Sequence, residues 1–192
     1  PSTAAAITPL LSRLSGESTL LFTQNGVGAV EEVSALFPAG AQPTYLSAIV
    51  THGVFSTGLF SVTHAGVADL KIGPVSPDTA LSASSRWLID TILSSEPLAA
   101  TEVGADELLK VTLEKLVANA IINPLTALFR IPNGAVLSPP LTPLRHALVS
   151  ETSSVILAHL STLGTLDAET AERLSVHGLG EMVERGDGGA VY

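Results

Sequence analysis

The hydrophobic pattern of the chain changes once, near residue 100, and this change limits the folds that the sequence can adopt. Before it, short apolar runs of strand type alternate with runs of helical spacing, and after about residue 105 every apolar stretch has helical spacing. The strand-type runs span residues 18–24 and 45–53, and the helical runs span residues 29–37 and 78–95. Strands that alternate with helices are typical of an α/β sheet. We therefore predict an α/β part over residues 1–100 and an all-α part over residues 101–192.

Two further segments complete the predicted α/β part. Residues 2–14 have the pattern of an amphipathic helix, with Ser2 or Thr3 as its N-cap. Residues 54–73 alternate in hydrophobicity and carry His-Ala-Gly midway, which predicts a β-hairpin with its turn there.

The composition excludes several classes of protein. The 192 residues are 46% hydrophobic and 14% charged, so the chain can bury a substantial core. Its net charge of −9 argues against nucleic acid or an anionic membrane surface as a partner. No apolar run approaches the roughly 20 residues of a membrane span. There is no cysteine, and the five histidines lack metal-ligand spacing, so we expect no metal site.

An otherwise apolar helical stretch carries a row of polar residues. Lys115, Asn119 and Asn123 are spaced i, i+4, i+8, which places them on one face over two turns. An amide buried there without a partner would cost about 1–3 kcal/mol. In one interpretation the amides bind neighbouring helix ends and the lysine extends to the surface. In the other, the row faces a ligand, and Asn133 in the following Ile-Pro-Asn-Gly turn closes one end of the site.

A glycine-containing loop follows the first predicted strand. Asn25, Gly26 and Gly28 lie between that strand and a helix, and Gly-Val-Gly imitates the start of G-x-G-x-x-G. Glu31 occupies the third glycine position, so this is not the first turn of a dinucleotide-binding fold. The loop suits a later strand-to-helix connection at the carboxyl edge of such a sheet, where ligands bind.

Taken together, these motifs resemble the ketopantoate reductase (2-dehydropantoate 2-reductase) family. The matching stretches are Gln-Asn-Gly-Val-Gly, Thr-His-Gly, Ile-Gly-Pro, the Lys-x-x-x-Asn-x-x-x-Asn-Pro-Leu-Thr-Ala run and Pro-Asn-Gly. The resemblance covers nearly the whole chain, and the Lys-Asn-Asn run is its most specific part. It implies the later part of a Rossmann-type NADP-binding domain followed by the first helices of a helical substrate domain.

The resemblance also implies a role for each matching residue. Lys115 matches the general acid that protonates the substrate carbonyl as hydride arrives from NADP(H). Asn119, Asn123 and Asn133 match residues that hold the substrate. Asn25 matches an asparagine that contacts both cofactor and substrate. The cofactor-binding set comprises Asn25, Gly26, Gly28 and Val54.

The chain departs from the family pattern at both ends. The family begins with a G-x-G-x-x-G strand and ends with an N-x-S-S-M stretch, and neither is present. We therefore expect the middle part of a cytoplasmic 2-dehydropantoate reductase of pantothenate biosynthesis, inactive as an isolated chain. A mitochondrial location and a homodimer stay open. The alternatives are a reductase of another 2-oxo acid and a non-catalytic fragment that serves as an interaction module.

Overall fold

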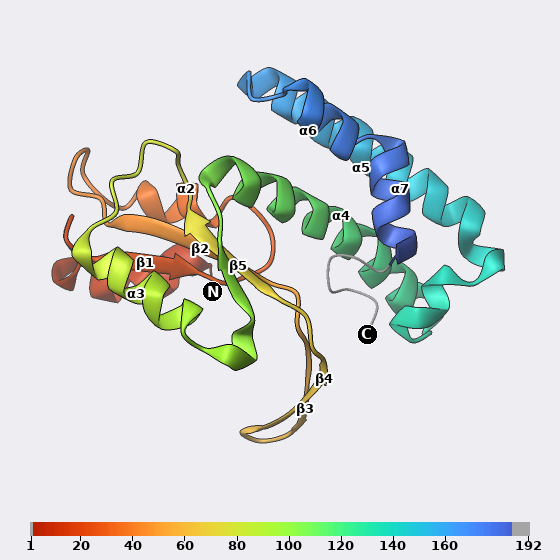
Figure 1. The fold of residues 1–192 in the computed structure, drawn as a ribbon, viewed down its shortest axis with the longest axis horizontal. Coiled ribbons are helices and arrows are strands. Elements are labelled where there is room, and N and C mark those ends of the chain that lie inside the picture. The colour runs from red at the N-terminus through yellow and green to blue at the C-terminus, as the bar shows by residue number, and fades with distance from the viewer. Residues whose placement is uncertain (1, 186–192) are drawn as a thin grey trace. The chain divides into compact units, whose positions relative to one another are not determined.

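The structure is a computed structural model that describes residues 2–185 (Figure 1). The chain divides into two compact units. The first comprises Pro1–Val50 with Asp69–Thr112, and the second comprises Thr51–Ala68 with Leu113–Tyr192. The first contains a four-stranded sheet and the second is mostly helical, which confirms the predicted combination of an α/β part and a helical part.

The sheet of the first unit has the strand order β1-β2-β5-β6. β2 is parallel to β1 and antiparallel to β5, and β5 is parallel to β6. The strands are β1 (Thr19–Phe22), β2 (Thr44–Val50), β5 (Leu70–Pro74) and β6 (Ala100–Glu102). The helices of this unit are α1 (Thr3–Ile7), η1 (Thr8–Arg13), α2 (Ala29–Ser34), α3 (Ala83–Leu93) and η2 (Glu96–Leu98). The succession β1–α2–β2, with parallel strands, forms a βαβ unit, in agreement with the predicted α/β sheet.

Alternate residues of β2 point to opposite faces of the sheet, as the two-residue period of a strand requires. Leu46 and Ala48 pack with Ile89 of α3 in one cluster of buried side chains. Ile49 packs instead with Leu108, from the first turns of α4 (Ala105–Phe129). The central strand is therefore covered by helices on both faces.

Two predicted elements differ from the structure. The predicted helix over residues 2–14 changes to a 3-10 helix at Thr8, because Pro9 has no N–H to continue the α-helical ladder. Its Ser2 N-cap is confirmed, since the Ser2 hydroxyl accepts a hydrogen bond from the Ala5 amide.

The predicted position of the hairpin turn is wrong. The hairpin is formed by β3 (Gly53–Gly58) and β4 (Ser61–Gly66), so the turn lies at Leu59–Phe60 and His-Ala-Gly lies within β4. Phe60 has a φ of 56°, a left-handed conformation that is rare for a bulky side chain and that turn signals in the sequence do not predict. The remaining residues form β5, which joins the larger sheet.

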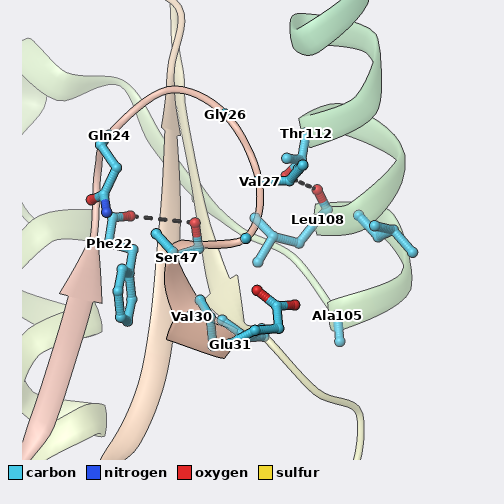
Figure 2. A pocket seen from close by; sticks show the side chains of 14 residues that line it. Phe22, Gln24, Gly26, Val27, Val30, Glu31, Ser47, Ala105, Leu108 and Thr112 are labelled. Carbon is cyan, nitrogen blue, oxygen red and sulfur yellow. Dashed lines mark hydrogen bonds between the residues drawn. The ribbon is translucent and has the colours of Figure 1, made fainter. Parts of the chain in front are cut away.

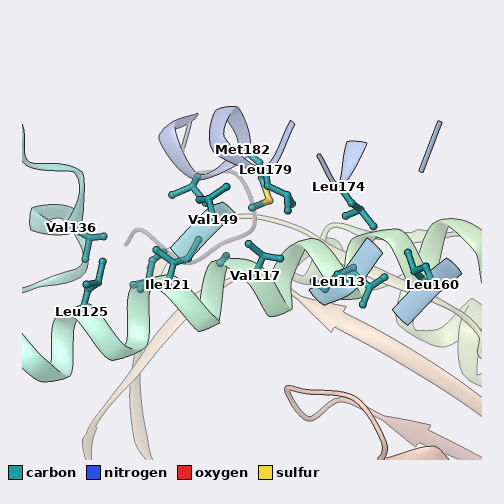
Figure 3. Close-up of a cluster of buried hydrophobic side chains, with 14 residues drawn as sticks. Leu113, Val117, Ile121, Leu125, Val136, Val149, Leu160, Leu174, Leu179 and Met182 are labelled. Atoms are coloured by element: carbon teal, nitrogen blue, oxygen red, sulfur yellow. The ribbon is translucent and has the colours of Figure 1, made fainter. Parts of the chain in front are cut away.

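The second unit has a continuous apolar core between helices (Figure 3). Its helices after α4 are η3 (Asn133–Leu137), η4 (Pro139–Leu141), α5 (Thr142–Leu163), α6 (Ala168–Arg173) and α7 (Val176–Arg185). The fully buried residues of the core include Val117, Ile121, Leu125, Val136, Leu160, Leu174 and Leu179. Polar contacts fix the same helices. The buried Ser153 hydroxyl donates to the Leu174 carbonyl at 2.8 Å, and Arg173 pairs with Glu114 of α4 through bonds of 2.6 and 2.8 Å.

We predict that Gly178→Ala destabilises the second unit. A Cβ at Gly178 would lie 2.5 Å from the Arg173 carbonyl oxygen, a backbone atom that can move only with the end of α6. Such overpacking costs about 1–3 kcal/mol. Gly180→Ala in the same helix is the matched control, because nothing lies within 4 Å of its added Cβ. Thermal unfolding of both variants tests this, and equal melting temperatures would contradict it.

Candidate active site

Helix α4 presents two rows of side chains that point in opposite directions. Val117, Ile121 and Leu125 form a row in the core of the second unit and are at most 2% exposed. Lys115, Asn119 and Asn123 form a row two residues earlier, which corresponds to a rotation of about 200° around the helix. The packing of the first row therefore turns the second row away from the core. Lys115 and Asn119 are half-buried, and Asn123 is exposed.

The amides of this polar row have no partner in the described part of the chain. Neither Asn119 nor Asn123 makes a side-chain hydrogen bond with residues 2–185, although Thr126 donates to the backbone carbonyl of Asn123 at 3.1 Å. The interpretation in which the two amides bind neighbouring helix ends therefore finds no support. Pro124, which follows directly, also lacks the N–H that would bind the Ala120 carbonyl.

Burial changes the acidity of the lysine in this row. Partial removal of Lys115 from water disfavours its charged form and lowers the pKa of its ammonium group below the 10.5 of an unperturbed lysine. A lysine with a lowered pKa gives up its proton more readily than one on an open surface. This is the property required of a general acid.

The fourth predicted polar residue, Asn133, begins the 3-10 helix η3 after α4. This turn is fixed by a buried cation that has no signal in the sequence. Arg145 of α5 is 5% exposed, and its Nη1 donates to the Val136 carbonyl of η3 at 3.0 Å. A buried arginine is uncommon unless it is paired, and the Glu184 carboxylate lies 3.8 Å from its Nη2. Arg145 thereby joins the Asn133 turn to α5.

In the first unit, the glycine loop adopts a conformation that its sequence explains. Gly26 and Gly28 have φ values of 93° and 92°, in the left-handed region that favours glycine. Gly28 is also the N-cap residue of α2. The side chain of Asn25 is exposed and makes no hydrogen bond to residues 2–185.

A cavity of about 140 Å³ lies between this loop, β2 and the start of α4 (Figure 2). Most of its lining is apolar or glycine backbone. The lining residues are Phe22, Gln24, Gly26, Val27, Gly28, Ala29, Val30, Glu31, Ser47, Val75, Ala105, Leu108, Leu109 and Thr112. The hydroxyl groups at its wall are used within the fold: Ser47 donates to the Phe22 carbonyl and Thr112 to the Leu108 carbonyl. The Glu31 carboxylate makes no hydrogen bond or ion pair with residues 2–185.

The predicted site residues thus fall into separate groups. Gly26 and Gly28 line the cavity of the first unit beside Asn25, and Lys115, Asn119 and Asn123 share one face of α4. Val54 lies in β3, where its side chain is exposed. The cavity residues of α4 carry no signal in the sequence, because Leu108 and Thr112 have only the ordinary pattern of a packed helix.

Comparison with known proteins assigns the chain to a class. Residues 1–77 match the family described as "Ketopantoate reductase PanE/ApbA", and residues 107–185 match "Ketopantoate reductase PanE/ApbA C terminal". The chain is similar to the 2-dehydropantoate 2-reductase of Vibrio cholerae, with 35% identity over 157 residues. It is 39% identical over 141 residues to a probable 2-dehydropantoate 2-reductase of Schizosaccharomyces pombe. The chain belongs to the ketopantoate reductase family, as the motif resemblance predicted.

Other relatives are named ketoisovalerate reductases. The ketoisovalerate reductase BEA2 of Gibberella fujikuroi is 35% identical over 170 residues. The matched parts cover 80% of this chain but 49% of the Vibrio cholerae enzyme and 36% of the Gibberella enzyme. The chain therefore spans about half or less of the length of the curated relatives that it matches.

Solved structures share the fold. The 2-dehydropantoate 2-reductase of Porphyromonas gingivalis superposes with a TM-score of 0.68 at 14% identity, covering 96% of this chain and 59% of that one. A complex of D-mandelate dehydrogenase with NADH gives 0.67 at 15% identity, covering 98% and 58%. These likenesses confirm the predicted Rossmann-type domain with a helical continuation. None of the described helices is long and apolar enough to cross a membrane.

We predict that Asn119→Ala and Asn123→Ala leave the stability of the fold nearly unchanged. Their amides have no partner among residues 2–185 to lose, so the free energy of unfolding should change by no more than about 0.5 kcal/mol. Ile121→Ala, in the same helix but fully buried, should lower it by about 2–5 kcal/mol. Chemical denaturation of the three variants measures the difference. A loss at Asn119 comparable to that at Ile121 would assign the amide a structural role.

Proposed function

We propose that this chain supplies the catalytic lysine and the nicotinamide side of an NADP(H)-dependent reductase that converts 2-dehydropantoate to pantoate. The observation that carries the proposal is the polar row of α4. A half-buried lysine with a lowered pKa is followed, one and two turns later, by amides without a partner in residues 2–185. A structural row would use those amides inside the fold, whereas a ligand-binding row leaves them available.

The chemistry of the row suits a 2-oxo acid with a hydroxyl group. Lys115 donates a proton from its Nζ to the ketone oxygen and becomes a neutral amine, which solvent then reprotonates. The amides of Asn119, Asn123 and Asn133 offer both donors and acceptors, as a hydroxyl, a carbonyl and a carboxylate require. Proton donation by a positioned acid contributes about 10²- to 10⁴-fold to the rate.

The residues of the first unit fit the nicotinamide end of the cofactor. The cavity beside Gly26 and Gly28 has apolar walls and exposed glycine backbone, which allow close approach of a flat ring. The Asn25 amide and the Glu31 carboxylate, both without partners in residues 2–185, offer hydrogen bonds to a carboxamide. When bound, NADPH supplies the hydride that reduces the ketone carbon. Residues 2–185 contain no G-x-G-x-x-G turn for its pyrophosphate.

The similarity to ketoisovalerate reductases supports a second candidate substrate, a 2-oxo acid without the hydroxyl group. A site that binds a substrate hydroxyl rejects an analogue lacking it by roughly 10⁴- to 10⁵-fold. The ratio of kcat/KM for ketopantoate and ketoisovalerate therefore separates the two. A ratio near one would exclude a dedicated hydroxyl contact at the asparagines.

A homodimer and a cytoplasmic location stay predictions, and one family neighbour is described as a dimeric ketopantoate reductase from Staphylococcus aureus.

We predict that Lys115→Met lowers kcat about 10²- to 10⁴-fold because the ketone loses its proton donor. Activity is best measured in a chimaera in which residues 1–192 replace the matching segment of the Vibrio cholerae enzyme. Lys110→Met, on another face of the same helix, is the control and should retain kcat. A Lys115→Met variant that keeps more than about a tenth of the activity would contradict the role.

The same chimaera tests the direction of the pKa shift. Lys115 must be protonated to act as an acid, and its protonated fraction falls as the pH rises through its pKa. Since burial lowers this pKa, kcat/KM should fall on the alkaline side at a pH below 10.5. An alkaline limb at or above that value would mean that another group limits the reaction.

We expect the 192-residue chain alone to bind NADPH weakly and to leave ketopantoate unreduced. A dinucleotide is held mainly by its pyrophosphate at the first glycine turn, and contacts by Asn25, Gly26, Gly28 and Val54 would reach only the nicotinamide end. Titration of NADPH into the purified chain, followed by its fluorescence, measures the affinity. Micromolar binding of NADPH, or its ketopantoate-dependent oxidation, would refute this expectation. The absence of any NADPH binding would favour the non-catalytic alternative.

A further inference from the structure

Two of the four asparagines of the chain, Asn25 and Asn133, are followed directly by glycine. Asparagine is a thermolabile residue, because the backbone nitrogen of the next residue can attack its side-chain carbonyl carbon and close a five-membered ring. A following glycine favours this reaction, since it has no Cβ to obstruct the approach. The two Asn-Gly pairs are therefore candidates for loss of the side-chain amide, and the fold decides between them.

The loop at Asn25 leaves both reacting groups available. Residues 24–27 form bends outside any helix or strand, and Asn25 and Gly26 are exposed. Neither the Asn25 side chain nor the Gly26 backbone N–H makes a hydrogen bond within residues 2–185. Nothing lies within 4 Å of a Cβ built on Gly26, so the loop has open space at this position (Figure 2). The attacking nitrogen, the side-chain amide and solvent water can therefore meet.

The second Asn-Gly pair has the same chemistry but a fixed backbone. Asn133 and Gly134 are the first two residues of the 3-10 helix η3. The Ala135 N–H donates to the Pro132 carbonyl at 3.0 Å, and the Ser138 N–H donates to the Ala135 carbonyl at 3.1 Å. Helical side chains tilt toward the N-terminus of the helix, away from the nitrogen of the following residue. Ring closure at Asn133 thus requires η3 to open first.

The remaining two asparagines are protected in other ways. Asn119 lies within α4, has a helical backbone and is followed by Ala120, which carries a Cβ. Asn123 is followed by Pro124, whose nitrogen carries no hydrogen to lose on ring closure. Of the four asparagines, Asn25 is the one that the fold leaves reactive.

We propose that Asn25 is a deamidation site. The backbone nitrogen of Gly26 loses its proton to solvent and bonds to Cγ of Asn25, and the Cγ–Nδ2 bond breaks to release ammonia. Water then opens the ring at either of its two carbonyl carbons, which leaves aspartate or isoaspartate at position 25. Both products replace a neutral amide by a carboxylate that is ionised at neutral pH. Isoaspartate also adds one carbon atom to the main chain of the loop.

The consequence for the cofactor rests on the proposed function, in which the Asn25 amide binds the nicotinamide carboxamide. An ionised carboxylate accepts hydrogen bonds but has no N–H to donate. The KM for NADPH should therefore rise as Asn25 is converted. Bound NADPH should in turn slow the conversion, because it occupies the amide and restrains the loop.

The test is incubation of the folded 192-residue chain in mildly alkaline buffer, followed by proteolysis and mass spectrometry. Peptides that contain Asn25 should gain the mass difference between an NH2 and an OH group and separate into aspartate and isoaspartate forms. Conversion at Asn133 should be at least about tenfold slower, because the opening of η3 adds to its barrier. In the urea-unfolded chain both Asn-Gly pairs should react at similar rates, since this protection is lost.

Asn25→Gln is the matched control, because its longer side chain cannot close a five-membered ring and the peptide should stay unmodified. Equal rates at Asn25 and Asn133 in the folded chain, or an Asn25 that is not converted, would overturn the proposal. In the chimaera, prior incubation should raise the KM for NADPH, whereas incubated and fresh Asn25→Gln should have the same KM. If the peptides convert as expected and this KM does not respond, the contact of Asn25 with the cofactor is wrong and the deamidation site stands.

Discussion

The burial of one side of helix α4 is the constraint on which the candidate site depends. Val117, Ile121 and Leu125 belong to one buried cluster with side chains of α5 and α7, and their burial fixes the rotation of the helix about its axis. A helix rotates about 100° per residue, so the row two positions earlier must face away from that core. The position of Lys115 is therefore a consequence of apolar packing. A slip of the helix by one residue would turn its ammonium group by that same angle, and the buried row resists such a slip because each of its side chains fills a closed space.

In the first unit, the corresponding constraint is the short connection between β1 and α2. The chain leaves a strand, reverses through Gly26 and Gly28 and enters a helix that begins at Ala29. Residues with a Cβ rarely adopt the positive φ values found there. The loop consequently exposes its backbone at the carboxyl end of a parallel strand. Open α/β sheets bind ligands at this position, in the crevice outside the carboxyl ends of their strands.

The sequence predicted these features where local chemistry determines them. The i, i+4, i+8 spacing placed Lys115, Asn119 and Asn123 on one face, and the glycines placed a turn between strand and helix. The sequence did not predict the features that depend on contacts between residues far apart in the chain. The hairpin turn at Phe60 has no sequence signal. The boundary between β4 and β5 has none either, because it is set by the pairing of β5 with β2. Arg145 resembles any helix-surface arginine until the fold buries it against the Val136 carbonyl. The contact between Nε2 of His64 and Nδ1 of His52, 3.1 Å apart, depends on the register of the β3–β4 hairpin, and spacing alone does not reveal it.

Burial lowers the pKa of Lys115 although a carboxylate is adjacent to it in the sequence. A carboxylate close to a lysine raises its pKa, and Glu114 is the adjacent residue in the sequence. Consecutive helical residues point about 100° apart, however, and the Glu114 oxygens are bound by Nε and Nη2 of Arg173 at 2.6 and 2.8 Å. These charge-assisted bonds direct the carboxylate toward α6 and offset its charge with that of the guanidinium. Burial is then the largest influence on Lys115, and it lowers the pKa. The same Glu114 carboxylate therefore joins α4 to α6 through Arg173.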